Sequence, residues 1–129
     1  MSVTKRGGVV VKQGGALRFL PASVVMRITA CPPISRLPGT PKQLLGITHT
    51  GGEIVPVVGT DGESRHTPLL VCLYLGEPVG LLGCDVVSTG SFEVDLATEG
   101  GVMFAGALAR TLDLTAVFAS LQTNVRWEG

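Results

Sequence analysis

Short apolar runs, each bounded by glycine, proline or polar residues, follow one another along the chain and predict strands joined by tight turns. Residues 9–11 are β-branched and lie between glycine pairs, which favours a strand there. A turn at residues 13–15 and a second strand over residues 16–20 would complete a hairpin. Because proline is accepted in the first turn of a helix, Pro21 followed by residues 22–25 predicts a short helix.

A second hairpin is the clearest local signal in the chain. Residues 44–48 and 54–58 are apolar runs separated by a short polar link. That link contains Gly51-Gly52, which adopts positive φ at low cost, so it predicts a hairpin turn. Residues 26–29 are expected to be extended before it. Pro56 lacks an N–H group, so its strand is expected at a sheet edge or beside a bulge.

The second half of the chain continues the same pattern. Residues 69–75 form a continuous apolar run, which predicts a buried strand, and residues 79–87 predict its hairpin partner. Residues 88–101 are largely polar and predict a link without regular structure. A last strand is expected over residues 102–108. Apolar residues then recur at helical spacing over residues 112–121, which predicts an amphipathic helix.

Composition supports one small domain built of strands. The chain has 129 residues, with 18 glycines, 8 prolines and only 16% charged residues, which favours short strands and turns. Ten basic and ten acidic residues give a net charge of zero without a basic run, so no nucleic-acid partner is expected. No apolar run approaches the roughly 20 residues of a membrane helix, so we expect no membrane insertion and a cytoplasmic location.

The residues that commonly hold metal ions are scattered along the chain. Cys31, Cys72 and Cys84 have no paired spacing and are interpreted as buried, reduced thiols. His49 and His66 do not complete a zinc motif with them. We therefore expect no metal and no cofactor.

Catalytic groups are equally sparse. Asp61, Ser64 and His66 share one predicted loop, but no strained nucleophile turn accompanies them, so a solvated loop is the preferred interpretation. A ligand-binding barrel would need titratable groups inside apolar runs, and the sequence has very few. The acidic residues of the predicted link are interpreted as a solvated surface: Glu93, Asp95 and Glu99. We therefore expect no enzyme activity.

The central hairpin also carries a specific sequence pattern. The residues that form it are, in chain order, Arg36-Leu37-Pro38, Pro41, Gly46-Ile47-Thr48, Gly52 and Ile54-Val55-Pro56-Val57. In spacing, this pattern resembles the central motif of CheW-like domains, the coupling modules of bacterial chemosensory arrays. The resemblance extends over residues 9–121 and is strongest over residues 34–58. It implies an all-β fold with one or two short helices, in which two small five-stranded barrel-like subdomains intertwine around one core.

The resemblance also implies where the domain begins and ends. We expect residues 1–8 to be disordered, residues 9–121 to form a single CheW-like domain, and residues 122–129 to form a loose tail. Trp127 is a possible anchor for that tail.

For function, the resemblance implies a non-enzymatic adaptor. In the family, an apolar groove between the subdomains takes the helical tip of a chemoreceptor, and other faces pair with the regulatory domain of a histidine kinase. Self-association as a structural subunit remains an alternative. A third possibility is a divergent member that has lost receptor–kinase coupling and binds another signalling or motility partner.

The residues expected to contact a partner follow from the same resemblance. Val25 and Ile28 occupy apolar positions of a family segment whose usual glutamate is Arg27 here, a reversal of charge. In the hairpin turn, the usual asparagine is His49 and the usual arginine is Gly51. These departures point to altered partners, whereas the apolar positions are also compatible with a purely structural role in the core.

Overall fold

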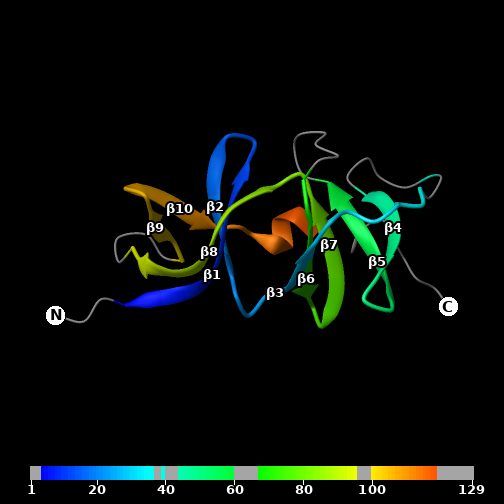
Figure 1. Ribbon diagram of the computed structural model, residues 1–129, viewed down its shortest axis with the longest axis horizontal. Helices are drawn as coiled ribbons and strands as arrows, with labels where there is room; N and C mark the ends of the chain where they lie inside the picture. The colour runs from blue at the N-terminus through cyan, green and yellow to red at the C-terminus, as the bar shows by residue number, and fades with distance from the viewer. Residues whose placement is uncertain (1–3, 37–38, 40–43, 60–66, 96–99, 119–129) are drawn as a thin grey trace.

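The computed structural model describes residues 4–36, 39, 44–59, 67–95 and 100–118. These residues form two five-stranded β units that lie side by side along the long axis of the molecule (Figure 1). One unit, the first barrel, closes in the order β1-β2-β10-β9-β8, and the other, the second sheet, runs β3-β6-β7-β5-β4. The all-β prediction, with two five-stranded units, is therefore confirmed.

The first barrel combines the N-terminal and C-terminal strands of the chain. Its five strands are β1 Lys5–Gln13, β2 Ala16–Pro21, β8 Asp85–Val94, β9 Val102–Phe104 and β10 Ala107–Thr111. The predicted opening hairpin is present as β1 and β2, although β1 begins at Lys5 rather than at residue 9. β10 runs parallel to β2 and completes the barrel, so strands from the two ends of the described chain depend on each other.

The second sheet is inserted between β2 and β8 and holds the central hairpin. Its strands are β3 Val25–Thr29, β4 Leu44–Thr50, β5 Glu53–Gly59, β6 Leu69–Tyr74 and β7 Glu77–Leu82. Two antiparallel hairpins, β4–β5 and β6–β7, are joined by a parallel pairing of β5 with β7. The turn at Gly51-Gly52 has φ of 59° and 79°, as the predicted hairpin requires.

Pro56 occupies a position that needs no N–H donor. β5 lies between β4 and β7, so the prediction of an edge strand is wrong. Pro56 pairs with Ile47, whose own N–H and C=O groups bond to Ser35 on the other side. The pairing of β5 with β7 begins only at Val57, and a bulge in β4 lies opposite that residue, so the expected neighbouring bulge is confirmed.

The helix predicted over residues 22–25 is absent, and the chain turns there instead. Pro21 is the last residue of β2, and the N–H of Val24 donates to its carbonyl at 3.0 Å, which closes a tight turn. Val25 then opens β3. The turn passes the chain directly from the first barrel to the second sheet.

Residues 79–101 are divided differently from the prediction. The strand expected over residues 79–87 is broken after Leu82, because Gly83 has a φ of 104° and the chain crosses back to the first barrel. The first half of the expected polar link belongs to strand β8, which pairs with β1 along its length. Phe92 points into the barrel, whereas Glu93 faces solvent. The alternation of buried and exposed side chains in β8 gives only a weak signal in the sequence, because residues 88–91 are serine, threonine and glycine.

Two further turns interrupt predicted strands. The single strand expected over residues 102–108 is a hairpin, with Ala105 and Gly106 at φ of 48° and 79° between β9 and β10. Leu75, expected at the end of a buried strand, lies in the β6–β7 turn with a φ of 52°. Apolar residues with positive φ are uncommon, so local pattern alone does not reveal these turns.

The units share one core. The largest cluster of buried residues draws Val11 and Leu20 from the first barrel and Leu70 and Leu81 from the second sheet. Smaller clusters fill the first barrel and the second sheet separately. Because the largest cluster belongs to both units, we expect them to unfold together.

The cysteines agree in part with the prediction of buried thiols. Cys72 and Cys84 are fully buried, whereas Cys31 is half-buried, and all three are thiols rather than disulfide partners. Burial, reinforced by the neighbouring Cys84, raises the pKa of Cys72 to about 12. Burial also raises the pKa of Cys31. Ionisation is therefore suppressed at the buried Cys72.

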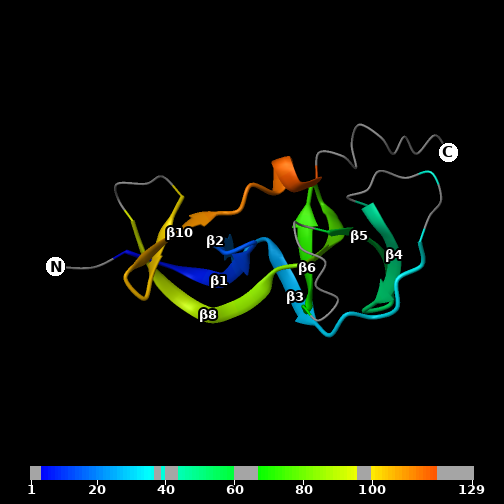
Figure 2. The ribbon, with the colours of Figure 1, turned by 90° about the horizontal axis from the view of Figure 1, so that it is seen from above.

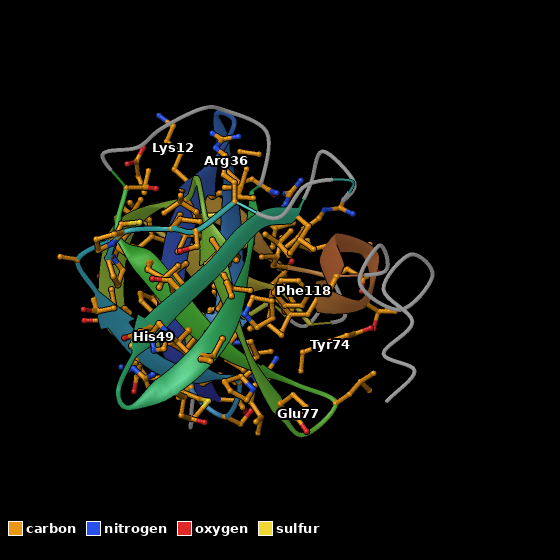
Figure 3. The ribbon with its side chains drawn as sticks, turned by 90° about the vertical axis from the view of Figure 1, so that its right-hand side faces the viewer. Lys12, Arg36, His49, Tyr74, Glu77 and Phe118 are labelled. Atoms are coloured by element: carbon orange, nitrogen blue, oxygen red, sulfur yellow. The ribbon has the colours of Figure 1, made fainter. Side chains whose placement is uncertain are left out.

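The predicted C-terminal helix is present at residues 114–118. The Oδ1 atom of Asp113 accepts a hydrogen bond from the N–H of Ala116 at 3.2 Å, which caps the helix. Phe118 is buried, and its ring lies 5.1 Å from that of Tyr74 (Figure 3). The helix lies on one side of the junction and β8 crosses on the other (Figure 2). Several predictions lie outside the described residues: the loop with Asp61, Ser64 and His66, the acidic residue Glu99, the rest of the helix and the tail with Trp127.

Candidate functional site: the seam between β3 and β4

The second sheet remains open between its edge strands, β3 and β4. The chain after β3 runs along β4, but Pro32 and Pro33 have no N–H groups to donate to a continuous ladder. Ser35 and Ile47 exchange two backbone hydrogen bonds of 2.8 and 2.9 Å. Thr48, which is buried, adds a bond from its Oγ1 to the carbonyl of Pro33 at 2.7 Å. We call this partly closed edge the seam.

Arg27 closes the other end of the seam. Its Nη2 atom donates to the carbonyl oxygen of Thr50 at 2.9 Å, linking β3 to the end of β4. The guanidinium lies over Gly51, since a Cβ atom built on that glycine would be only 2.6 Å from Arg27 Cζ. The Nε atom of Arg27 is buried and has no partner among the described residues. The seam therefore holds a half-buried cation beside a residue without a side chain.

The structure thus brings together two of the predicted site residues, Arg27 and Gly51. In the family pattern these positions carry a glutamate and an arginine, so the two departures concern one place in the fold. In this chain, the cation that reaches the hairpin turn comes from β3. An arginine at Gly51 would meet the guanidinium of Arg27 at this position.

His49 lies on the outer face of the same hairpin. It is exposed and forms a cross-strand pair with Ile54, which is 59% exposed. Figure 3 shows His49 on this hairpin, well away from Tyr74 and Phe118. The outer face of the hairpin therefore combines the apolar side chain of Ile54 with the polar imidazole of His49.

The two apolar residues predicted to meet a partner differ in exposure. Val25 is half-buried and packs against the shared core, so part of its side chain has a structural role. Ile28 is 38% exposed. Between them, the pairing of β3 with β6 shifts register and leaves Met26 as an extra residue that is 45% exposed. Sequence analysis missed Met26 and Ile54. The local sequence pattern reveals neither the bulge in β3 nor which side of the β4–β5 hairpin faces solvent.

We call six residues of β3 and of the β4–β5 hairpin the seam surface: Met26, Arg27, Ile28, His49, Gly51 and Ile54. An arginine among exposed apolar side chains is typical of protein–protein contact sites. Among the described residues, no group of three histidine, cysteine, aspartate or glutamate side chains is placed to hold a metal ion. Within the same residues, no helix has the length and apolar character needed to cross a membrane.

Comparison with known proteins agrees with this fold. The model of the CheW-like domain family matches residues 7–88, which include the second sheet and its seam. The chain belongs to the CheW-like domain family. The crystal structure of the scaffolding protein TtCheW from Thermoanaerobacter tengcongensis resembles this CheW-like chain with a TM-score of 0.73. The two are 19% identical over 91% of this chain and 90% of the other, a likeness that shows the shared fold. No curated protein matches the chain.

Proposed function

We propose that this CheW-like domain is a non-enzymatic adaptor that couples a chemoreceptor, or another sensor, to the regulatory domain of a histidine kinase. Membership of the family supports the adaptor role, and so does the fold shared with a protein described as a scaffold. An adaptor works through surfaces rather than a catalytic set, and the seam surface has the composition of a contact site.

The observation that carries the adaptor role is membership of the CheW-like family. The position of the Arg27 guanidinium over Gly51 supports the seam as a contact site. The family pattern places a glutamate and an arginine at these positions, which together are neutral, whereas Arg27 with Gly51 leaves one positive charge. Thr50 accepts one of the five N–H groups of Arg27, so others remain for a partner. A partner carboxylate fits this cation, and a charge-assisted hydrogen bond of this kind contributes about 1.5–3 kcal/mol.

Coupling requires two partners at once. We assign Ile28 and the exposed part of Val25, with Arg27, His49 and Gly51, to contact with the kinase domain, and a separate face to contact with a helical tip. Simultaneous occupation of both faces converts weak separate contacts into an ordered assembly.

A second candidate is favoured by the change of charge at the seam. A partner domain matched to a glutamate–arginine pair meets an uncompensated cation here, which disfavours the standard partner and favours a more acidic one. On this alternative, the domain has left receptor–kinase coupling and serves a different signalling or motility system.

Both candidates can be tested by capture of named partners from the native lysate. The variants are Arg27→Glu, and Arg27→Glu combined with Gly51→Arg, because arginine at position 51 collides with Arg27 when introduced alone. Arg110→Glu is the matched control, since it makes the same charge change at an exposed position in the first barrel. Recovered chemoreceptor and histidine kinase are quantified by mass spectrometry.

The outcomes separate the two functions. If the wild type and Arg110→Glu recover both a receptor and a kinase, and Arg27→Glu loses the kinase, the domain is a coupler that uses the seam. If only the double variant recovers them, the domain serves another partner. Recovery of neither by any variant would contradict the adaptor proposal.

A further inference from the structure

Strand β8 leaves most of one side open. On its other side it pairs with β1 along its length, whereas on this side β9 pairs only with Glu93 and Val94. Among the described residues, no strand pairs with this side of residues 85–92, which we call the free edge. Residues 89–91 are exposed one after another, so the backbone of the free edge is open to solvent there.

The backbone hydrogen bonds of β8 alternate between its two sides. Val94 donates its N–H on the β1 side at 2.9 Å, whereas Asp95 donates to Gly101 on the opposite side at 3.1 Å. Because this alternation continues back along an antiparallel strand, the N–H and C=O groups of Thr89 and Ser91 point away from β1. The free edge therefore presents backbone donors and acceptors that another extended segment can match.

The free edge lacks the residues that usually keep strand edges from pairing. Edge strands of natural proteins are commonly protected by charged side chains or proline, and residues 86–92 contain neither. A bulge opposite β1 sets off Val87, which is apolar and 42% exposed. At Gly90, a Cβ atom would meet nothing within 4 Å, so the space beside it is open. An exposed edge of this composition is suited to strand addition.

The existing partner strand, β1, shows which kind of segment β8 accepts. Lys12 of β1 lies opposite Asp85. Lys5 lies opposite Glu93, and glycine and valine fill residues 7–11 between the two lysines. Both acidic residues are exposed at the ends of the free edge. A strand added on the open side would therefore be favoured by basic residues near its ends and small or β-branched residues between them.

The same two acidic residues disfavour a second copy of this chain as the occupant. If two copies paired antiparallel along the whole stretch, Asp85 of each copy would lie opposite Glu93 of the other. In a parallel pair, each acidic residue would lie opposite its own counterpart. Like charges directly opposite each other destabilise a sheet, so a different partner, with basic residues, is favoured.

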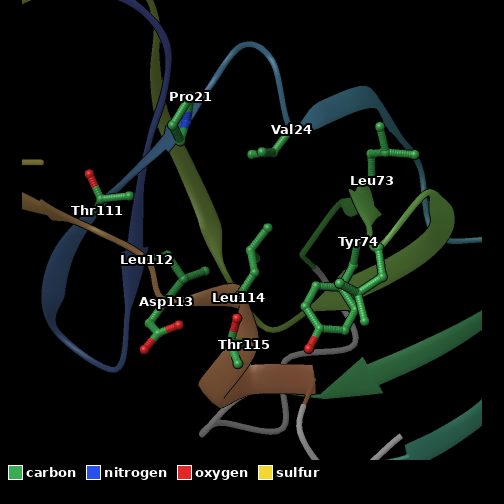
Figure 4. Close-up of a pocket in the computed structure, with 10 residues that line it drawn as sticks. Pro21, Val24, Leu73, Tyr74, Thr111, Leu112, Asp113, Leu114 and Thr115 are labelled. Carbon is green, nitrogen blue, oxygen red and sulfur yellow. The ribbon is translucent and has the colours of Figure 1, made fainter. Parts of the chain in front are cut away.

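The free edge is separate from the cleft at the junction of the two units. That shallow cleft of about 530 Å³ is lined by the β2–β3 turn, the end of β6 and the chain leading into the helix (Figure 4). A groove between the units is where the family resemblance implies a helical tip. β8 crosses the junction on the side opposite the helix (Figure 2), so the two places do not overlap.

We propose that the free edge of β8 binds an extended segment of a protein partner as an added strand. The centre of the segment pairs with Thr89 and Ser91 through its backbone. A lysine or arginine near each end of the segment lies beside Asp85 and Glu93. The site belongs to the first barrel, so it does not depend on the function proposed for the seam surface in the second sheet.

The test is hydrogen exchange of the ¹⁵N-labelled full chain, followed by NMR with and without a nine-residue peptide. This lysine peptide has lysine at both ends and alternating valine and threonine between them. The amides of Thr89 and Ser91 should exchange rapidly in the free chain and slow about tenfold or more when the peptide saturates it. The amides of Gly90 and Phe92 face β1, so their exchange should change little.

Two control peptides separate backbone pairing from side-chain contact. In the first, every amide between the lysines is N-methylated and cannot donate a hydrogen bond, so its affinity should be about tenfold or more weaker. In the second, glutamate replaces both lysines. Because exposed ion pairs contribute little individually, its affinity should be only about threefold or more weaker than that of the lysine peptide.

Charge-reversed variants test where the ends of the segment lie. Asp85→Lys combined with Glu93→Lys should reverse the preference, so that the glutamate peptide binds more tightly than the lysine peptide. Glu77→Lys is the matched control, because Glu77 is an exposed carboxylate in β7, outside the free edge. This control should keep the wild-type affinity for both peptides.

Other results would overturn the proposal. Absence of saturable binding of the lysine peptide would do so, and so would equal binding of its N-methylated form. Unchanged exchange at Thr89 and Ser91 in the presence of bound peptide would place the peptide elsewhere. If these amides were already protected in the free chain, the edge would be covered by the chain itself, or by a second copy if the protection rose with protein concentration.

Discussion

The contact between Arg27 and Gly51 predicts a non-additive response when both residues are changed. Gly51→Arg alone forces a non-glycine residue to a φ of 59°, at a cost of about 1–2 kcal/mol. It also displaces the guanidinium and its bond to Thr50, which costs about 1–2 kcal/mol more at this half-buried site. We therefore expect Gly51→Arg to lower the free energy of unfolding by roughly 2–4 kcal/mol.

Arg27→Glu alone loses the same bond to Thr50 and should cost about 1–2 kcal/mol. The double variant loses that bond only once, removes the collision and places opposite charges in contact. Its cost should therefore be smaller than the sum of the single costs by about 1–2 kcal/mol. Urea unfolding of the four proteins, followed by circular dichroism, measures this coupling energy.

Gly52→Arg is the matched control, because Gly52 has a φ of 79° but a Cβ atom there would meet nothing within 4 Å. Its cost should be that of the backbone strain alone, about 1–2 kcal/mol, and it should add independently to Arg27→Glu. Additivity of Gly51→Arg with Arg27→Glu within about 0.5 kcal/mol would refute the contact on which the seam surface rests.

Three further predictions concern the folded domain. Burial raises the pKa of Cys72 from 9.0 to about 12, so the unfolded chain loses this proton at a lower pH than the folded chain does. The free energy of unfolding, measured in urea, should therefore fall between these pH values by up to about 1 kcal/mol per pH unit. The fall should be smaller in a Cys72→Ala variant, and an equally steep fall there would contradict this. Asp113→Ala removes the helix cap and should cost about 1 kcal/mol in the same assay, whereas Asp113→Asn should be near neutral. Gly46→Ala places a Cβ atom against the carbonyl oxygen of Ser35, so hydrogen exchange should accelerate at the amides of Ser35 and Ile47 that bridge the seam. Unchanged protection of these amides would argue against this close approach.

Local sequence pattern was sufficient for two hairpins whose turns carry paired glycines, whereas the hairpin of β9 and β10, with Ala105 in its turn, was missed. The hairpin over Leu44–Gly59 follows from two apolar runs and a glycine turn, and the opening hairpin follows from the same logic. The central hairpin also carries the family pattern. Comparison with that pattern identified the five candidate site residues, two on the hairpin and three on β3. The expected bounds of the domain and its tail stay predictions.

Tertiary structure decided every feature that depends on partners distant in sequence. β8 is a strand because β1 offers it a complete ladder, although Ser88–Ser91 have little apolar character of their own. Gly83 breaks an apolar run because the chain must cross between units, and the Pro21–Val24 turn makes the opposite crossing. At the seam, the sequence by itself identified a reversed charge at Arg27 and a missing side chain at Gly51. Only the fold shows that the Arg27 guanidinium fills the space that a side chain at Gly51 would occupy. Strand pairing, not sequence separation, determines which side chains meet.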